Sequence, residues 1–244
     1  MIRVENVSKS FERPVLKDIN LVVPQGCLYG LVGPGASGKS VLLKVITALL
    51  RPEQGRVLID GKNILAMSEL ELQDFRKNIG FLFQNNALFD FMTVGQNIAF
   101  PLRQLFDLSE EEINERIAER LRCVSLPGFE HRLPAGLSGG QKKRVGVARA
   151  TVATAPFVLY DEPAAGLDPV TSQKIFDLLR AEQQAANATV IMVSSDLDRL
   201  LPVTDRVGMM YRGQLIFDGT TAEARQSTNP YVYQFINGIP EGPL

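Results

Sequence analysis

One stretch constrains the fold of this chain more than any other: CLYGLVGPGASGKSVLLKVITALL, residues 27–50. Its first part, 27–33, is a short apolar run typical of a buried strand, and apolar residues continue with helical character over 41–50. The segment GPGASGKS between them matches G-x-x-x-x-G-K-[ST] in the setting that this pattern requires, after a strand and before a helix. That setting disfavours a glycine turn packed only for shape. The sequence therefore predicts a loop that binds phosphate groups.

This loop predicts ATP and Mg²⁺ as the bound groups. Its glycines let consecutive backbone N–H groups close around a phosphate, and the start of the following helix favours negative charge. Lys39 is expected to reach the β and γ oxygens, and the Ser40 hydroxyl to ligate Mg²⁺. The predicted nucleotide contacts are Gly33, Pro34, Gly35, Ala36, Ser37, Gly38, Lys39, Ser40 and Val41.

Strands and helices alternate along the rest of the chain. Strands are expected at 2–7, 16–23, 57–59, 80–83, 157–163, 189–194 and 206–211, and helices at 69–77, within 93–124, from the segment 137–141 to about 153, at 171–186 and at 197–203. The first two strands, joined by a polar bend at 8–14, form an antiparallel pair in the simplest interpretation. The later alternation predicts an α/β fold with a mainly parallel sheet and helices on both faces.

A chain of 244 residues can bury a large core, and we expect one domain. We assign its core to 1–85 and 155–225, an inserted helical lobe to about 86–154, and a C-terminal tail to 226–244. Within the lobe, Ser109 and Glu112 are spaced as a capping box ahead of Ile113, Ile117 and Leu121, which recur at helical spacing.

The composition of the chain limits which partners and which cellular compartment we expect. Apolar residues make up 45% of the chain and charged residues 22%, with a formal net charge of -1, so we expect no nucleic-acid partner. Cys27 and Cys123 are isolated, which predicts two small buried residues without a metal or disulfide role. No apolar stretch reaches the roughly 20 residues needed to span a bilayer. We expect a cytoplasmic protein whose membrane role, if any, comes through a partner.

The segment FVLYDEP, 157–163, is a buried strand that ends in two acids. Asp161 is placed to hold a Mg²⁺ shell, and Glu162 to orient and polarise a water. Paired acids at a strand end can also be helix N-caps, and taken alone the segment fits both interpretations equally. The phosphate loop upstream favours the metal role.

The segment LSGGQ, 137–141, predicts a second anion site. Ser138 has N-cap character, Gly139 and Gly140 leave backbone amides open, and the first turn of the next helix carries three cations, Lys142, Lys143 and Arg144. A capped helix without a ligand is the simpler alternative. Beside a phosphate loop, however, this segment suggests a cover for the nucleotide of a second copy, in a head-to-tail dimer with two ATP molecules at the interface.

These motifs, with Gln84 after GFLF and AGLDP at 165–169, resemble the nucleotide-binding subunit of an ABC transporter over essentially all of residues 1–225. The resemblance implies a P-loop NTPase in which Ser138, Gly139, Gly140, Gln141 and Asp168 act across the dimer interface. It also implies that Phe11 stacks on adenine, that Gln84 senses γ-phosphate and Mg²⁺, and that Glu162 is the general base. By stacking logic alone, Phe11 could instead be a half-buried aromatic at a strand end.

The segment VIMVSSD, 190–196, departs from that family. ABC subunits usually carry histidine before the aspartate, and this chain has Ser195 there. The single histidine, His131, lies about sixty residues upstream and is expected to be a neutral surface residue. A serine side chain is shorter than imidazole by roughly a few ångströms, so contact with γ-phosphate would need a water or a closer backbone. We therefore expect slow turnover.

Residues 83–103 and 234–244 are similar to segments of the Mla/MCE-type ATPases. This resemblance implies phospholipid transport between bacterial membranes, a permease and a periplasmic MCE-type lipid-binding subunit as partners, and a place on the cytoplasmic face of the inner membrane. Apolar residues after Gln84 suit either a groove for a coupling helix or the core of the lobe: Leu88, Phe89, Phe91 and Met92.

Two functions remain open. The first is an ATP-hydrolysing subunit of a lipid transporter, and the second is a nucleotide-gated regulatory subunit that turns over slowly. Intact Lys39, Asp161 and Glu162 favour the first, and other cargoes stay possible for it. The chain has a single nucleotide domain and no long heptad insert, which argues against the ribosome-bound and chromosome-associated members of the ABC superfamily.

Overall fold

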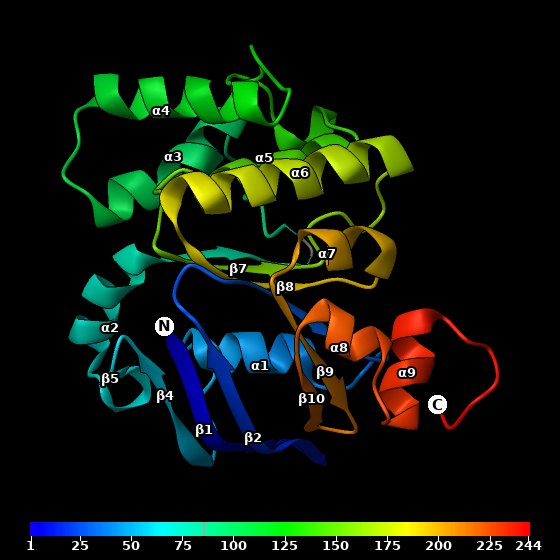
Figure 1. Ribbon diagram of the computed structural model, residues 1–244. Helices are drawn as coiled ribbons and strands as arrows, with labels where there is room; N and C mark the ends of the chain where they lie inside the picture. The colour runs from blue at the N-terminus through cyan, green and yellow to red at the C-terminus, as the bar shows by residue number, and fades with distance from the viewer. Residues whose placement is uncertain (85) are drawn as a thin grey trace. The chain divides into compact units, whose positions relative to one another are not determined.

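The computed structural model describes residues 1–84 and 86–244 (Figure 1). Its contacts form two compact units, which we treat separately. Unit 1 combines Met1–Leu72 with Thr189–Leu244, and unit 2 is Gln73–Ala188. In the sequence, unit 2 is therefore inserted between the two parts of unit 1.

Unit 1 begins with an antiparallel sheet in the order β2-β1-β4-β5. Its strands are β1 (Ile2–Ser10), β2 (Pro14–Val23), β4 (Gln54–Ile59) and β5 (Lys62–Asn63). The predicted antiparallel pair is confirmed, although the bend between β1 and β2 takes only residues 11–13. Asp60 and Gly61 both have left-handed backbone, with φ of 47° and 78°, which suits the two-residue turn between β4 and β5.

Unit 1 also contains parallel strands, and the phosphate loop follows one of them, β3. β3 (Leu28–Val32) pairs in parallel with β8 (Thr189–Val193) and with β9 (Arg206–Tyr211), and β10 (Gln214–Gly219) pairs antiparallel with β9. Every residue of β3 and β8 is buried, as expected of parallel strands covered on both faces. The helices here are α1 (Lys39–Ile46), η1 (Ile64–Ala66) and α7 (Leu197–Val203). α1 ends four residues before its predicted end, because the chain turns at Ala48 with a φ of 53°.

Pattern analysis missed β10 and two short helices of unit 1, α8 (Thr221–Arg225) and α9 (Pro230–Asn237). α9 lies inside the predicted tail. Its ends carry clear signals: the Asn229 side chain accepts from the Tyr231 N–H, proline follows at the first helical position, and Gly238 ends the helix in a left-handed conformation. Val232 and Ile236, four residues apart, are buried against unit 1.

Unit 2 is mainly helical. It begins at Gln73, inside α2 (Glu69–Phe75), and continues through η2 (Arg76–Asn78). In its described residues, the strands β6 (Ile79–Leu82) and β7 (Phe157–Asp161) pair in parallel. The other helices are α3 (Val94–Leu105), α4 (Glu110–Cys123), η3 (Pro134–Gly136), α5 (Gly139–Thr151) and α6 (Pro169–Ala186). α3 packs against α4 and α5. The predicted capping box at Ser109 is present, and Ile113, Ile117 and Leu121 are buried as expected.

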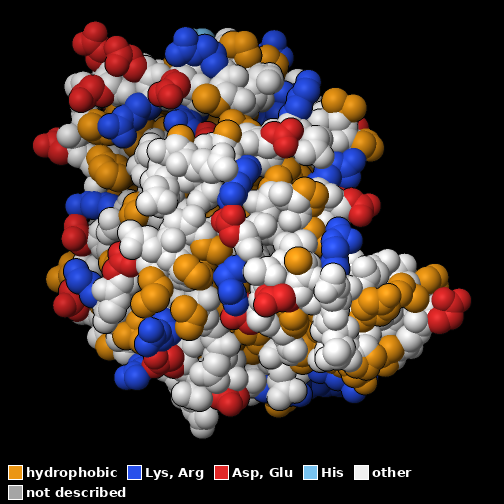
Figure 2. Space-filling view, in the orientation of Figure 1, with side chains coloured by type: hydrophobic (Ala, Val, Ile, Leu, Met, Phe, Trp, Pro, Cys, Tyr) orange, Lys and Arg blue, Asp and Glu red, His pale blue; other side chains and the backbone are white. Residues whose placement is uncertain are grey.

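The prediction for Cys123 is wrong. Cys27 is buried, but Cys123 is exposed at the last residue of α4, where Leu121 and Val124 take the inward positions. None of the helices in the described part of the chain has both the length and the apolar character needed to cross a bilayer. Figure 2 shows basic and acidic side chains interspersed on the face in view, as expected from the balanced charge.

Candidate nucleotide-binding site

The phosphate loop of unit 1 connects β3 to α1, and its glycines allow the backbone conformation that it adopts. Gly33 and Gly38 have φ of 140° and 103°, and Ala36 has a φ of 58°. A Cβ added at Gly33 would lie 2.1 Å from the backbone oxygen of Met210. An L side chain cannot occupy that position without displacing backbone. The predicted order of strand, glycine loop and helix is therefore present.

Lys39 places its charge inside this loop. Its Nζ donates to the backbone oxygens of Gly33 and Pro34 at 2.7 and 2.8 Å, and to the hydroxyl of Ser37 at 3.3 Å. Ser37 itself is 4% exposed, so the loop is closed on its inner side. Ser40 is the second residue of α1, at the end of the helix that favours anions. The segment thus offers a fixed cation, a hydroxyl and a helix start within a few residues.

Phe11 is an exposed aromatic in the bend between β1 and β2. Its side chain is 60% exposed, and the Lys9 ammonium lies 5.3 Å from the centre of its ring. The alternative of a half-buried residue at a strand end is therefore wrong. A Cβ added at Gly38 would lie 2.9 Å from the Val15 backbone oxygen, so the start of β2 adjoins the phosphate loop within unit 1.

The two acids of unit 2 end β7. Asp161 is 4% exposed, and its Oδ1 is buried with no hydrogen-bond partner in the part of the chain that the structure describes. Glu162 follows with a left-handed φ of 54° and is half-buried. A buried carboxylate oxygen without a donor is costly unless another group, such as a cation, approaches it. Oxygen donors of this kind are what Mg²⁺ prefers.

The helix-cap interpretation of these acids is wrong, because Asp168 caps the next helix. Its Oδ1 accepts from the backbone N–H groups of Val170 and Thr171 at 3.0 and 2.9 Å. The hydrogen bond with Thr171 holds the pKa of Asp168 below its ordinary value. Asp168 is exposed at the start of α6, and this cap leaves Asp161 and Glu162 outside that helix.

The LSGGQ segment forms the start of α5. The Ser138 hydroxyl accepts from the Gln141 N–H at 3.2 Å, and the Gln141 side chain accepts from the Ser138 N–H at 2.9 Å, so the predicted cap is a full capping box. A Cβ added at Gly139 would meet nothing within 4 Å, whereas one at Gly140 would lie 3.1 Å from Leu167. The exposed backbone of this turn faces open space at Gly139.

Two of the three cations expected beside the second anion site, Lys143 and Arg144, donate to backbone oxygens of unit 2. Lys143 is 4% exposed and donates to the Gln84 backbone oxygen at 2.8 Å, and Arg144 donates to the backbone oxygens of Val124 and Ser125 at 3.1 Å. Both side chains therefore bind their own unit, because the helical period turns them inward. Burial lowers the pKa of Lys143, and the charges of Glu162 and Asp161 oppose this shift. The acids and Lys143 thus share one electrostatic environment in unit 2.

In VSSD, two of the three polar residues have local structural roles. The Ser194 hydroxyl accepts from the Asp196 N–H at 3.1 Å. Asp196 accepts from the Arg199 N–H at 3.3 Å at the start of α7 and forms an ion pair with the Arg199 guanidinium at 2.6 Å. Ser195 lies between them and is exposed. His131, in unit 2, is also exposed, as predicted.

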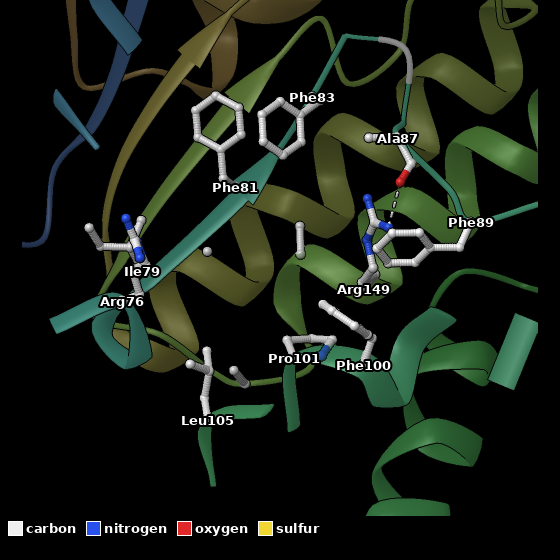
Figure 3. Close-up of a pocket in the computed structure, with 13 residues that line it drawn as sticks. Arg76, Ile79, Phe81, Phe83, Ala87, Phe89, Phe100, Pro101, Leu105 and Arg149 are labelled. Carbon is white, nitrogen blue, oxygen red and sulfur yellow. Dashed lines mark hydrogen bonds between the residues drawn. The ribbon is translucent and has the colours of Figure 1, made fainter. Parts of the chain in front are cut away.

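A groove of about 310 Å³ opens in unit 2 beside the Gln84 turn (Figure 3). Its walls come from β6, α3, α5 and the residues around Gln84, and they are largely apolar, with four aromatic rings and two aliphatic side chains: Phe81, Phe83, Phe89 and Phe100, with Pro101 and Leu105. Of the four apolar residues proposed for a groove, Phe89 lines this one, and Phe91 is 78% exposed beyond it. Leu88 and Met92 are half-buried and are not among the lining residues.

The inward face of α5 was not predicted from the sequence. Arg149 lines the groove and donates to the backbone oxygen of Ala87 at 2.8 Å (Figure 3). The signal was available, since Lys143, Gly146 and Arg149 recur every three residues and so lie near one another on one side of the helix.

Comparisons with a family model, with related sequences and with solved structures all match this chain to ATP-binding proteins of ABC transporters. Residues 16–165 match the family model described as "ABC transporter". The whole chain is 39% identical to the "probable ribonucleotide transport ATP-binding protein mkl" of Mycobacterium leprae, covering 70% of it, and 36% identical to the "intermembrane phospholipid transport system ATP-binding protein MlaF" of Haemophilus influenzae, covering 93% of it. The dimeric ATP-binding cassette MJ0796, solved with ADP and phosphate, superposes with a TM-score of 0.86 at 31% identity, covering 90% of this chain and 98% of that one.

Proposed function

This chain belongs to the ABC transporter family, as an ATP-binding subunit, and from that premise we propose that it hydrolyses ATP to drive phospholipid transport between bacterial membranes. The observation that carries the ATPase part is the phosphate loop, in which Lys39 holds a positive charge against the Gly33 and Pro34 carbonyls. ABC cassettes bind ATP, and the phospholipid cargo rests on the likeness to MlaF.

We assign the nucleotide contacts to residues 33–41 and the adenine platform to Phe11. The exposure of that ring supports stacking, because its face is available to a ligand. For Mg²⁺ we propose the oxygen donors Ser40, Gln84 and Asp161, and the buried Oδ1 of Asp161, which has no partner among the described residues, is the observation in favour of a cation. When bound, the ion would neutralise charge on the transferred phosphoryl group.

Glu162 is the proposed general base and Gln84 the proposed sensor of γ-phosphate. The base has to orient a water and accept its proton, and a half-buried carboxylate at the end of a rigid strand keeps a defined position for this task. Ser195 takes the place of the usual histidine. Its exposed hydroxyl would act on γ-phosphate through a water, which supports slow turnover and keeps a nucleotide-gated regulatory subunit as the second candidate.

A second copy of this chain is the proposed partner at the nucleotide. The exposed turn at Ser138, Gly139, Gly140 and Gln141 would cover the ATP of the other copy, with Asp168 beside it. Two features favour this: Gly139 faces open space, and the Ser138 capping box fixes the backbone that would meet the phosphates. The similar cassette MJ0796 is described as dimeric.

The groove beside Gln84 is the proposed contact with an integral-membrane permease. Its largely apolar walls suit the apolar face of a short helix, and the Arg76 and Arg149 side chains add cations to the lining. Through the permease the subunit would lie on the cytoplasmic face of the inner membrane. A periplasmic MCE-type lipid-binding subunit is the further partner that we infer from the likeness to MlaF.

The decisive experiment compares Glu162→Gln and Lys39→Ala in the complex purified from membranes with its native partners. Glu162→Gln should bind Mg²⁺-ATP and accumulate as a nucleotide-bound dimer without turnover, because the amide keeps the shape and loses the basicity. Lys39→Ala should lose ATP affinity itself. Hydrolysis at the wild-type rate by Glu162→Gln would show that another residue is the base.

The cargo is tested on the same complex. Mass spectrometry of bound lipid should find phospholipid with the wild-type assembly, together with a permease and a lipid-binding subunit. Recovery of a permease for nucleosides, amino acids or sugars would reject the phospholipid assignment and leave the ATPase assignment intact.

A further inference from the structure

The bend that carries Phe11 is held from one side by a single carboxylate. β1 lies between β2 and β4 in the first sheet of unit 1 (Figure 1). Glu53, which directly precedes β4, binds the end of β1: one carboxylate oxygen accepts from the Lys9 Nζ at 2.6 Å and the other from the Ser10 N–H at 2.7 Å. The Glu53 N–H also donates to the Ser8 backbone oxygen at 3.0 Å. Glu53 therefore fixes the backbone that leads into Phe11.

Lys9 connects this carboxylate to the ring of Phe11. Its ammonium lies over the ring, 5.3 Å from the ring centre, which is within the range of a cation–π contact. The Lys9 side chain is only 14% exposed, whereas Phe11 is 60% exposed. Since the ammonium occupies one face of the ring, a flat base can stack only on the other face.

The pairing of β1 with β2 gives the bend irregular support. Its register shifts at the end of β1, and the last pair joins Ser10 to Pro14, which has no N–H to donate. Within the bend, the Phe11 N–H donates to the Arg13 backbone oxygen at 3.1 Å. The Ser10 N–H is bound by Glu53 instead of by β2. The position of Phe11 therefore depends on a side chain from the opposite neighbour of β1.

Glu53 carries its negative charge at neutral pH. Hydrogen bonds from Lys9 and Ser10 hold the pKa of this carboxyl below its ordinary value. An exposed ion pair of this kind contributes little to the stability of a folded protein. The Lys9 ammonium, however, contacts both the carboxylate and the aromatic ring, so the pair joins the start of β4 to the ring itself.

We propose that Lys9 and Glu53 are positioning residues for adenine, because they hold Phe11 with one face covered by the ammonium and the other face open to the base of ATP. This inference rests on the proposed function, which makes Phe11 the adenine platform. It adds the two residues that orient the platform and the face that the base takes. Neither residue is assigned a contact with phosphate or with the reacting atoms, so their loss should weaken binding of the base and leave the chemical step unchanged.

Steady-state kinetics of the complex purified with its native partners give the first test. Lys9→Met and Glu53→Ala should raise the KM for ATP about 3-fold to 10-fold, the size expected for a net hydrogen-bond contribution, and change kcat less than about twofold. Lys9→Arg keeps the cation and should keep the KM within about twofold of wild type. The matched control is Glu5→Ala, which removes another ion-paired carboxylate of β1 outside the bend and should behave as wild type.

Direct binding separates the base from the phosphates. Isothermal titration calorimetry of the complete chain measures its affinity for ATP and for inorganic tripolyphosphate, which has no base. Lys9→Met and Glu53→Ala should lose affinity for ATP only, whereas Lys39→Ala should lose affinity for both. Phe11→Ala should weaken ATP binding about tenfold, because it removes the stacking. On the Phe11→Ala background, Lys9→Met and Glu53→Ala should cost less than about twofold more, since they act through the same ring.

A fluorescent reporter follows the ring without nucleotide. The chain contains no tryptophan, so Phe11→Trp introduces a single indole at the bend. Adding Glu53→Ala should lower the fluorescence anisotropy of this indole, because the bend loses its support, and adding Glu5→Ala should leave the anisotropy unchanged. The urea midpoint of either double variant should stay within about 0.3 M of that of Phe11→Trp, since exposed ion pairs contribute little to stability.

Three results would overturn the positioning role while the ATPase assignment stands. These are wild-type ATP affinity in Lys9→Met and Glu53→Ala, an equal loss of tripolyphosphate affinity, and a loss of the same size on the Phe11→Ala background. Wild-type ATP affinity in Phe11→Ala would reject the adenine platform, and the positioning role with it.

A wild-type chain that binds neither ATP nor tripolyphosphate would instead reject the proposed function. The anisotropy of the indole, measured without nucleotide, then still decides whether the ion pair holds the bend. Equal anisotropy with and without Glu53→Ala would refute that part of the proposal.

Discussion

Replacing Gly33 by alanine should damage the phosphate loop more than any other single methyl group added to it. The added Cβ would lie 2.1 Å from the Met210 oxygen, about 0.9 Å inside the 3.0 Å approach that real Cβ atoms keep, and the φ of 140° is one that L residues rarely adopt. Met210 cannot retreat, because its strand β9 is paired with β3 at Val32–Met209. The loop itself therefore has to move.

The free-energy cost of Gly33→Ala follows from the disfavoured φ and from the overlap with the Met210 oxygen. A backbone held in a disfavoured region costs about 1–3 kcal/mol, and relief of the overlap by a loop shift adds about 1 kcal/mol. The loop can relax when no phosphate is bound, so most of the cost should appear as lost ATP affinity. A total of about 2–4 kcal/mol corresponds to a loss of about 30-fold to 1,000-fold.

Titration with a fluorescent ATP analogue measures this loss, and urea unfolding measures the stability that accompanies it. The control is Gly136→Ala, at a position of η3 where a Cβ meets nothing within 4 Å and no left-handed φ is present. It should bind ATP as wild type does and change stability by less than about 0.5 kcal/mol. ATP affinity of Gly33→Ala within threefold of wild type would refute the argument from loop geometry.

Two further predictions concern the serine that replaces histidine and the half-buried Arg120–Glu182 ion pair of unit 2. Ser195→His should raise kcat of the complex by about 10² to 10³ with little change in ATP affinity, since the gain arises only as charge develops in the transition state. Steady-state kinetics measure this change, with Ser195→Ala as the comparison. An unchanged kcat would mean that Ser195 is not near γ-phosphate. Arg120→Met should destabilise the protein by about 3 kcal/mol at pH 7.5, because it leaves Glu182 charged at 19% side-chain exposure. Burial already raises the pKa of Glu182 and Arg120 opposes that rise, so the variant's deficit should shrink as Glu182 takes up a proton on going to pH 5, and an equal deficit in urea at both pH values would contradict this.

Much of the fold was predictable because its signals are local. The strand, glycine loop and helix around Lys39, the capping boxes at Ser109 and Ser138, and the fully apolar strands at 28–32 and 189–193 each depend on residues a few positions apart. Backbone preference and hydrophobic periodicity act over the same range. The helix α9 carries equally local signals at Asn229 and Gly238, although residues 226–244 are predicted as a tail.

The sequence by itself determined the chemistry of the chain: a phosphate loop, two acids at the end of a strand and a capped glycine turn, because each requires particular residue types in a particular order. The tertiary structure decided which of the polar residues remain available. Lys143 and Arg149 differ little from Lys142 in a list of residues, yet packing turns the first two toward the carbonyls of Gln84 and Ala87. Asp168 caps α6 in place of the paired acids, and the Asp161 Oδ1 is left without a partner among the described residues. The spacing on α5 indicates that Lys143 and Arg149 share one side of the helix, but the carbonyls that they meet belong to a segment about 60 residues away in the sequence, and no local pattern specifies those partners.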